Sequence, residues 1–323
     1  MDKKILVTGG AGFIGSAFVH EAEKRNDKVI VLDALTYAAN KENIATTNAN
    51  LIIGNICDQK LIEDILFTHD IDFIVNFAAE THVDNSITGP SIFIESNICG
   101  TFSLLEAARK FAQNKPEFRY IQISTDEVYG SLDDDSKFSE ETKMQPNSPY
   151  SASKAAGDML VRAWWETYRL PAITTNCSNN YGPRQHVEKL IPKMISNALK
   201  GLDLPIYGNG KNIRDWIHVE DHVLGIYLAM EKGTLGETYC FGGDAEKRNI
   251  EIVTMICELL DELRPKSTSY KKQIKFVEDR AGHDYRYAIN NSKAMRELGF
   301  KHLYDFNQGL LNTVKWYLEN LND

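Results

Sequence analysis

Short apolar runs alternate with amphipathic stretches along the first half of the chain. The runs Lys4–Thr8, 28–32 and Phe73–Asn76 have the length of buried strands, and the segments between them repeat apolar residues every three to four positions. Strands that alternate with helices in this way predict right-handed crossovers and a parallel, doubly wound sheet. Further strands are predicted at 51–53, 119–123 and 172–177, and helices at 16–24, 58–69, 91–111 and 151–168.

The pattern becomes mixed after Cys177. We therefore expect an α/β protein with one domain over residues 1–178 and a smaller, mixed α/β domain over 179–323. Residues around 213–245 look like return strands and a helix of the main sheet, which makes the second domain discontinuous. Its predicted helices are 189–200, 219–231, 249–263 and 304–321, with short apolar segments at 204–207 and 274–277.

Three glycines separate the first strand from the first helix. Gly9, Gly12 and Gly15 would make a tight turn, admit a pyrophosphate to the backbone N–H groups and let the helix pack on the strand. The positive end of the helix dipole would face the phosphates. Asp33 follows Gly15 by 18 residues, where a ribose-binding acid belongs, and it would repel a 2′-phosphate. This half of the chain therefore predicts a Rossmann sheet that binds NAD in preference to NADP.

Ionisable side chains gather after the fifth strand and at the start of the next helix. Thr125, Asp126 and Glu127 follow the strand directly, and Tyr150 and Lys154 stand four residues apart. Open α/β sheets bind ligands at the carboxyl ends of their strands. An ammonium beside a phenol lowers the phenol pKa from about 10. We therefore expect Tyr150 to take a proton from a substrate alcohol while hydride leaves for a nicotinamide.

The two adjacent carboxyl groups add a second kind of chemistry. Elimination of water needs a base and an acid, and neighbouring carboxyl groups supply both when one is protonated. Successive residues at a strand end point apart, so Asp126 and Glu127 would address adjacent carbon atoms. Like charge and a water-poor pocket would favour a protonated Asp126.

Composition and charge narrow the classes of function. A net charge of −9 argues against a nucleic-acid surface, and no apolar run is long enough to span a bilayer. The five cysteines show no C-x-x-C spacing, so we expect reduced thiols and a cytoplasmic protein without membrane attachment. His218 and His222 lack the adjacent glutamate of an H-E-x-x-H site, and no metal is expected.

These motifs resemble those of extended short-chain dehydrogenases/reductases and, within them, the dTDP-glucose 4,6-dehydratase family almost end to end. The resemblance implies oxidation of a glucose unit at C4, loss of water across C5 and C6, and return of hydride to C6, giving dTDP-4-keto-6-deoxy-glucose. It implies that Glu127 is the base, that Asp126 is the acid, and that Thr125 and Tyr150 contact the C4 oxygen. The matching segments are TGGAGFIG at 8–15, AAETHVD at 78–84, STDEVYG at 124–130, YSASK at 150–154, NCSNNYGP at 176–183, KLIP at 189–192, IRDW at 213–216 and DRAGHD at 279–284.

The resemblance also implies the residues that contact each ligand. For NAD they are Gly9, Gly12, Phe13, Ile14, Gly15, Asp33, Ala34, Leu35, Thr36, Asn55, Ile56, Phe77, Ala78, Ala79, Thr81, Ser96, Tyr150, Lys154 and Asn180. For the nucleotide-sugar substrate, dTDP-glucose, they are Thr81, His82, Thr125, Asn179, Lys189, Leu190, Pro205, Ile206, Tyr207, Arg214, Asn249, Asp279, Arg280 and His283.

Departures and rival functions qualify this resemblance. Asn55 stands where the family usually has an acid facing the adenine, and Ala281 replaces a proline. One rival is another nucleotide-sugar dehydratase or a 4-epimerase of the same fold; Asp126 argues against the epimerase, while the nucleotide base stays open. The other rival is a non-catalytic NAD-binding protein. The resemblance further implies a homodimer, in which helices 91–111 and 151–168 form a four-helix interface.

Overall fold

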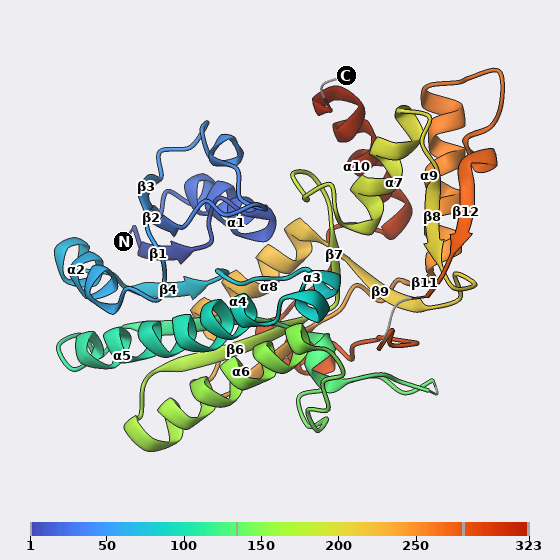
Figure 1. The fold of residues 1–323 in the computed structure, drawn as a ribbon. Coiled ribbons are helices and arrows are strands. Elements are labelled where there is room, and N and C mark those ends of the chain that lie inside the picture. Colours follow the sequence, from blue (N-terminus) through green and yellow to red (C-terminus); the bar gives the residue numbers. More distant parts are fainter. Residues whose placement is uncertain (1, 134, 280–281, 322–323) are drawn as a thin grey trace.

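A seven-stranded parallel sheet lies at the centre of the computed structural model, which describes residues 2–133, 135–279 and 282–321 (Figure 1). Its strands are β1 (Lys4–Thr8), β2 (Lys28–Asp33), β3 (Asn50–Ile53), β4 (Phe73–Asn76), β5 (Arg119–Thr125), β6 (Ala172–Cys177) and β10 (Thr238–Phe241). The order β10-β6-β5-β4-β1-β2-β3 starts at β1 and winds outward in both directions. The predicted α/β class and doubly wound parallel sheet are confirmed.

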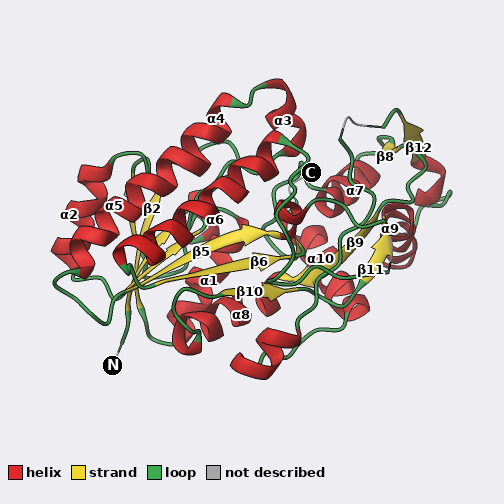
Figure 2. Cartoon of the chain, turned by 90° about the horizontal axis from the view of Figure 1, so that it is seen from below, coloured by secondary structure: helices red, strands yellow, loops and turns green. Residues whose placement is uncertain are grey.

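Helices cover both faces of this sheet (Figure 2). On one face, α1 (Phe13–Lys24) packs beside α8 (Val219–Lys232). On the other lie α2 (Gln59–His69), α5 (Thr101–Ala112) and α6 (Pro149–Tyr168). The helices begin where side chains satisfy their first N–H groups: Asp58 accepts from the N–H of Leu61, and Ser148 caps α6.

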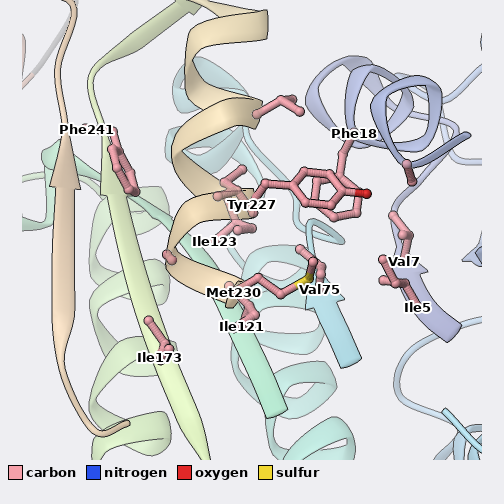
Figure 3. Close-up of a cluster of buried hydrophobic side chains, with 14 of the residues drawn as sticks. Ile5, Val7, Phe18, Val75, Ile121, Ile123, Ile173, Tyr227, Met230 and Phe241 are labelled. Carbon is pink, nitrogen blue, oxygen red and sulfur yellow. The ribbon is translucent and has the colours of Figure 1, made fainter. Parts of the chain in front are cut away.

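Alternate residues of the strands face two separate apolar cores. In β1, Ile5 and Val7 join the core under α1 and α8, while Leu6 joins the opposite one. Phe18 and Tyr227 stack between α1 and α8 with ring centroids 4.6 Å apart (Figure 3). Both faces of the sheet are apolar and covered, so only its edges and its strand ends can meet a ligand.

The helix predicted over 91–111 is interrupted in the structure. It starts as α4 (Ser91–Phe93), passes through the π-helical stretch η2 (Ile94–Gly100) and continues as α5. Asn97 in this stretch accepts from the N–H of Glu80 at 2.9 Å and donates to its carbonyl oxygen at 3.0 Å. The π-turn thus holds the end of β4, a local feature that hydrophobic periodicity does not reveal.

The second lobe is built from helices α7 (Leu190–Leu199), α9 (Asn249–Leu263) and α10 (Phe306–Asn320), which share one core (Figure 1). Two small sheets accompany them. One has the order β11 (Glu246–Arg248), β9 (Ile213–His218), β7 (Asn179–Tyr181), and the other pairs β12 (Ile274–Val277) with β8 (Leu204–Tyr207). The remaining elements are α3 (Val83–Thr88), π-helical η5 (Ala294–Leu298), and 3-10 turns at Lys41–Asn43, Asp126–Tyr129 and Tyr270–Gln273.

One topological expectation is wrong. The strand Ile213–His218 does not return to the main sheet, because it pairs with β7 and β11 instead. Only α8 and β10 return, with β10 lying parallel to β6. Within the described residues, no helix has the length and apolar character needed to cross a membrane.

Candidate functional site

The glycine loop between β1 and α1 is too tightly packed for side chains. Gly9 has a φ of +69°, and a β-carbon there would lie 2.7 Å from the backbone nitrogen of Ala78. A β-carbon at Gly15 would lie 2.3 Å from the carbonyl oxygen of Gly9. Gly12, at the start of α1, is less crowded, with a β-carbon there 3.2 Å from the carbonyl oxygen of Gly9, and it lines a cleft. The three glycines thus make the turn, the packing contact and the open helix end that a diphosphate needs.

Asp33 closes this loop from the end of β2. Its Oδ2 accepts from the N–H of Ala11 at 2.9 Å, and its Oδ1 accepts from the N–H of Leu35 at 2.8 Å. Burial raises the pKa of this carboxyl. Each oxygen can accept a second hydrogen bond and Asp33 lines the cleft, so the carboxylate braces the loop and is suited to accept from a ribose.

A single cleft of about 330 Å³ runs along the carboxyl ends of the strands. It brings together all of the predicted NAD-contacting residues except Leu35, whose backbone instead supports Asp33. Those lining it are Gly9, Gly12, Phe13, Ile14, Gly15, Asp33, Ala34, Thr36, Asn55, Ile56, Phe77, Ala78, Ala79, Thr81, Ser96, Tyr150, Lys154 and Asn180.

The reactive end of the cleft lies where β5 ends. Thr125 is the last residue of the strand, and the chain then tightens into a 3-10 turn. Asp126 and Glu127 point apart as expected, but a turn and not strand alternation separates them. The N–H of Glu127 donates to Thr125 Oγ1 at 3.3 Å, which places Glu127 on the cleft wall and Asp126 in the protein interior behind it.

Asp126 is set up to hold a proton. It is 1% exposed, and its Oδ2 has no hydrogen-bond partner among the described residues. Burial raises its pKa well above the usual range, and the charges of Glu127 and Asp215 raise it further. The two adjacent carboxyl groups therefore have different environments, as an acid and base pair requires.

Tyr150 and Lys154 enter the cleft from the first two turns of α6. Lys154 Nζ donates to the carbonyl oxygen of Ile123 at 2.7 Å, which fixes the lysine against β5. In the protein by itself, the pKa of Tyr150 is raised, first by burial and then by the charge of Glu127. The predicted lowering of the Tyr150 pKa is thus wrong for the protein by itself. Burial disfavours the charged phenolate, and it also lowers the pKa of Lys154.

The predicted substrate residues fall into two groups. Thr81, Thr125, Asn179 and Lys189 line the cleft, and Lys189 Nζ donates to the carbonyl oxygen of Thr81 at 2.9 Å. The others lie outside its wall: His82 caps α3, Leu190 begins α7, Pro205, Ile206 and Tyr207 belong to β8, and Asn249 begins α9. Tyr207 contacts Asp84, and His283 contacts Asp279.

Arg214 is buried and held by the protein itself. Its guanidinium donates to the carbonyl oxygens of Ile213, Asp284 and Tyr285 and lies 4.2 Å above the ring of Tyr287. Arg280, the second predicted arginine, and Ala281 lie outside the described residues.

Several cleft residues were missed by sequence reasoning. Glu80 follows β4, and burial together with the charge of Glu188 raises its pKa. Glu188, Gln185 and His186 come from the irregular segment before α7, and Glu188 accepts from the hydroxyl of Tyr37 at 3.2 Å. Irregular segments carry no periodicity, so only the Tyr-Gly-Pro turn preceding them hinted at their position.

Comparison with known proteins gives the site a context. The family profile described as "GDP-mannose 4,6 dehydratase" matches residues 6–313. The curated dTDP-glucose 4,6-dehydratase of Salmonella typhimurium is 51% identical over 336 residues, covering 98% of this chain and 93% of that protein.

Solved structures share both the fold and the length. DesIV, a dTDP-glucose 4,6-dehydratase from Streptomyces venezuelae with NAD and TYD bound, is 44% identical with a TM-score of 0.90, covering 98% of this chain and 97% of its own. A UDP-glucose 4-epimerase from Thermotoga maritima, with UDP-glucose, has the same TM-score at 28% identity, covering 99% and 100%. The fold is thus common to both activities, whereas sequence identity separates them. The resemblance is confirmed: the chain belongs to the dTDP-glucose 4,6-dehydratase family of extended short-chain dehydrogenases/reductases.

Proposed function

We propose that this protein is an NAD-dependent lyase that dehydrates dTDP-glucose to dTDP-4-keto-6-deoxy-glucose. The observation that carries the proposal is the environment of Asp126 and Glu127: one carboxyl group is buried with a raised pKa, and its neighbour faces the cleft beside Tyr150. The relatives named above support the substrate and the cofactor. The same pair disfavours the 4-epimerase, because epimerisation needs no acid for a leaving hydroxyl.

The residues along the cleft fit NAD. The loop from Gly9 to Gly15 would hold the diphosphate, Asp33 the adenosine ribose, and Tyr150 and Lys154 the nicotinamide ribose. Asn55 would face the adenine with a neutral acceptor in place of an acid. When bound, NAD would accept the hydride from C4 of the sugar and supply it again to C6, and its oxidised nicotinamide ring carries a positive charge.

We assign one residue to each proton transfer. Tyr150 takes the proton of the C4 hydroxyl, and Thr125, at the end of β5, hydrogen-bonds the same oxygen. The ketone formed at C4 acidifies the hydrogen at C5, which Glu127 removes. Asp126 protonates the C6 hydroxyl so that it leaves as water. A proton returned to C5 completes the reaction.

Asp126 reaches the sugar only if its proton faces the cleft. It lies directly behind Glu127, and its Oδ2 has no partner in the described part of the chain. Asp126 itself does not line the cleft, so donation to the C6 hydroxyl requires its Oδ2 to turn toward the sugar. Lys154, held 2.7 Å from the carbonyl oxygen of Ile123, lies one helical turn from Tyr150 on α6.

The nucleotide would lie toward the second lobe. Thr81, Asn179 and Lys189 extend the cleft in that direction, and we propose that the diphosphate meets Lys189 and Arg214 and the base meets β8. Arg280 and His283 complete the proposed set, with His82, Leu190, Asn249 and Asp279 beside them. We propose a cofactor domain over 1–178, completed by the returning α8 and β10, and a discontinuous nucleotide-sugar domain from the rest of 179–323.

Incubation in heavy water with dTDP-, UDP-, GDP- and CDP-linked glucose tests the function. We expect turnover of dTDP-glucose to a 4-keto-6-deoxy sugar, with deuterium at C5 and the original C4 hydrogen at C6 by NMR. A product that retains its C6 hydroxyl would establish the epimerase. Tight NAD binding without turnover of any nucleotide sugar would establish the non-catalytic alternative.

We also propose a cytoplasmic homodimer. Phe102 on α5 is 44% exposed, Met159 on α6 is 56% exposed, and Tyr168 at the end of α6 is also exposed. These apolar side chains lie on two helices that pack together on one face of the sheet, as a four-helix interface requires. All five cysteines are free thiols, which is in keeping with a reducing compartment.

A further inference from the structure

A carboxyl group that none of the proposed steps uses is buried below the active site. Asp158 lies on α6, one helical turn beyond Lys154, and is 3% exposed. Its Oδ2 accepts a hydrogen bond of 2.6 Å from the hydroxyl of Ser124 on β5. A carboxylate placed in the interior costs free energy unless it serves a partner, so the position calls for a reason.

The first connection of Asp158 is electrostatic. Lys154 is equally buried, and burial lowers its pKa, while the negative charge of Asp158 counteracts that effect. The hydrogen bond that Lys154 Nζ makes to Ile123 employs a neutral carbonyl oxygen. Asp158 is thus the nearby acid that compensates the ammonium.

The second connection is geometric. Asn176 on β6 donates through Nδ2 to Asp158 Oδ2 at 3.4 Å and to the carbonyl oxygen of Thr125 at 3.0 Å. Together with Ser124, it joins Asp158 to the end of β5, where the reactive residues begin. The groups that face this carboxyl are Lys154 from α6, Ser124 and Tyr120 from β5, Tyr129 from the 3-10 turn, and Asn176 from β6, with Cys177 beside Lys154.

We propose that Asp158 is a positioning residue of the active site, which keeps the Lys154 ammonium charged and anchors the end of β5. This inference rests on the proposed function, because it assigns the charge that the tyrosine step requires. It acts through Lys154 and Asn176 and does not touch the sugar.

The environment of Asp158 agrees with this role. Burial raises its pKa to about 6, while Lys154 and the hydrogen bonds from Ser124 and Asn176 lower it. Because this pKa lies below neutrality, Asp158 is ionised at pH 7 and above, where Lys154 must remain protonated.

The experiment compares Asp158→Asn with Asp158→Glu and Ser124→Ala. Asparagine has the same shape and can still accept from Ser124, but it has no charge. We expect Asp158→Asn to lower the Lys154 pKa by about one to two units. The titration is followed in ligand-free protein by NMR of [13Cε]-lysine, with the Lys154 signal assigned by its loss in Lys154→Arg.

The pH profile of kcat supplies the second measurement. In Asp158→Asn its basic limb should move to lower pH by the same interval, and Asp158→Glu should restore it. Ser124→Ala removes the hydrogen bond but keeps the charge, so its basic limb should stay in place. If asparagine prevents folding, Asp158→Ser removes the charge with a smaller side chain.

The outcomes separate the two proposals. An unchanged Lys154 titration in the folded neutral variant overturns the role of Asp158, whatever the wild-type activity. Absent turnover of dTDP-glucose by the wild type refutes the proposed function while leaving the ligand-free titration interpretable.

Discussion

The N–H of Glu127 donates to the hydroxyl of Thr125, and this contact turns Asp126 into the interior while Glu127 faces the cleft. Two consecutive carboxyl groups therefore reach different environments within one turn of chain. Substitutions at these two positions can therefore separate oxidation at C4 from the elimination of water.

Replacing Asp126 with asparagine should separate oxidation from elimination. The amide cannot supply the proton for the leaving hydroxyl, so we expect dehydration to slow by about 10²- to 10⁴-fold. Oxidation at C4 should persist, because Tyr150 and Thr125 remain in place. Rapid-quench mass spectrometry and absorbance at 340 nm measure the two steps separately. Loss of NADH formation together with elimination would show that Asp126 also serves the first step.

The glycine loop permits a matched pair of substitutions. Gly15→Ala should lower both NAD affinity and stability, by about 1–3 kcal/mol for the latter, because its β-carbon would meet the carbonyl oxygen of Gly9. Gly12→Ala should lower NAD affinity about tenfold and cost less stability than Gly15→Ala, since its β-carbon would lie 3.2 Å from the carbonyl oxygen of Gly9, against 2.3 Å at Gly15, and Gly12 lines the cleft. Calorimetric titration and thermal unfolding provide the two measurements.

Gly89→Ala serves as the control for this pair, because the nearest atom to a β-carbon there is 3.7 Å away. It should leave NAD affinity unchanged. Equal effects of Gly12→Ala and Gly89→Ala on NAD binding would contradict the placement of the diphosphate.

His222 should make stability depend on pH. It is fully buried, and burial lowers its pKa to about 3. Between pH 6.5 and 3 the unfolded chain binds a proton that the folded protein does not, so stability is lost as pH falls. From pH 6.5 to pH 5 this amounts to about 2 kcal/mol.

Urea unfolding at pH 7, 6 and 5 measures that slope. His222→Gln should flatten it by about the same 2 kcal/mol, whatever its effect on absolute stability. A slope unaffected by His222→Gln would mean that the buried imidazole is not the group that titrates.

The proposed dimer can be tested by introducing charged side chains into its expected interface. Met159→Glu and Phe102→Glu place carboxylates among the exposed apolar side chains of α5 and α6 and should convert dimer to monomer in light scattering. Phe276→Glu is the control, because Phe276 is 60% exposed on β12, in the second lobe. A wild-type monomer, or dissociation by Phe276→Glu alone, would contradict the four-helix arrangement.

The sequence predicted the main sheet well, because buried parallel strands read as short apolar runs and their connecting helices have regular periodicity. It also predicted most of the cofactor cleft, since the glycine spacing and Asp33 belong to one local unit. Their positions follow from a strand, a turn and a helix that are adjacent in the chain.

Features that depend on tertiary contacts could not be predicted from the sequence pattern. The π-turn at Asn97 is fixed by its bonds to Glu80, and the pairing of β9 with β7 and β11 joins segments separated by α7 and α8. The raised pKa of Tyr150 likewise results from burial, which the spacing of Tyr150 and Lys154 does not encode.

The late return of α8 and β10 constrains how the protein can mature. When the first 178 residues have left the ribosome, β6 still lacks its outer neighbour, and Phe18 of α1 still lacks Tyr227. Those partners are synthesised only after β7 and α7 of the other lobe. Nascent chains are therefore expected to depend on chaperones over this interval, and a truncation after residue 178 should aggregate instead of yielding an isolated NAD-binding domain.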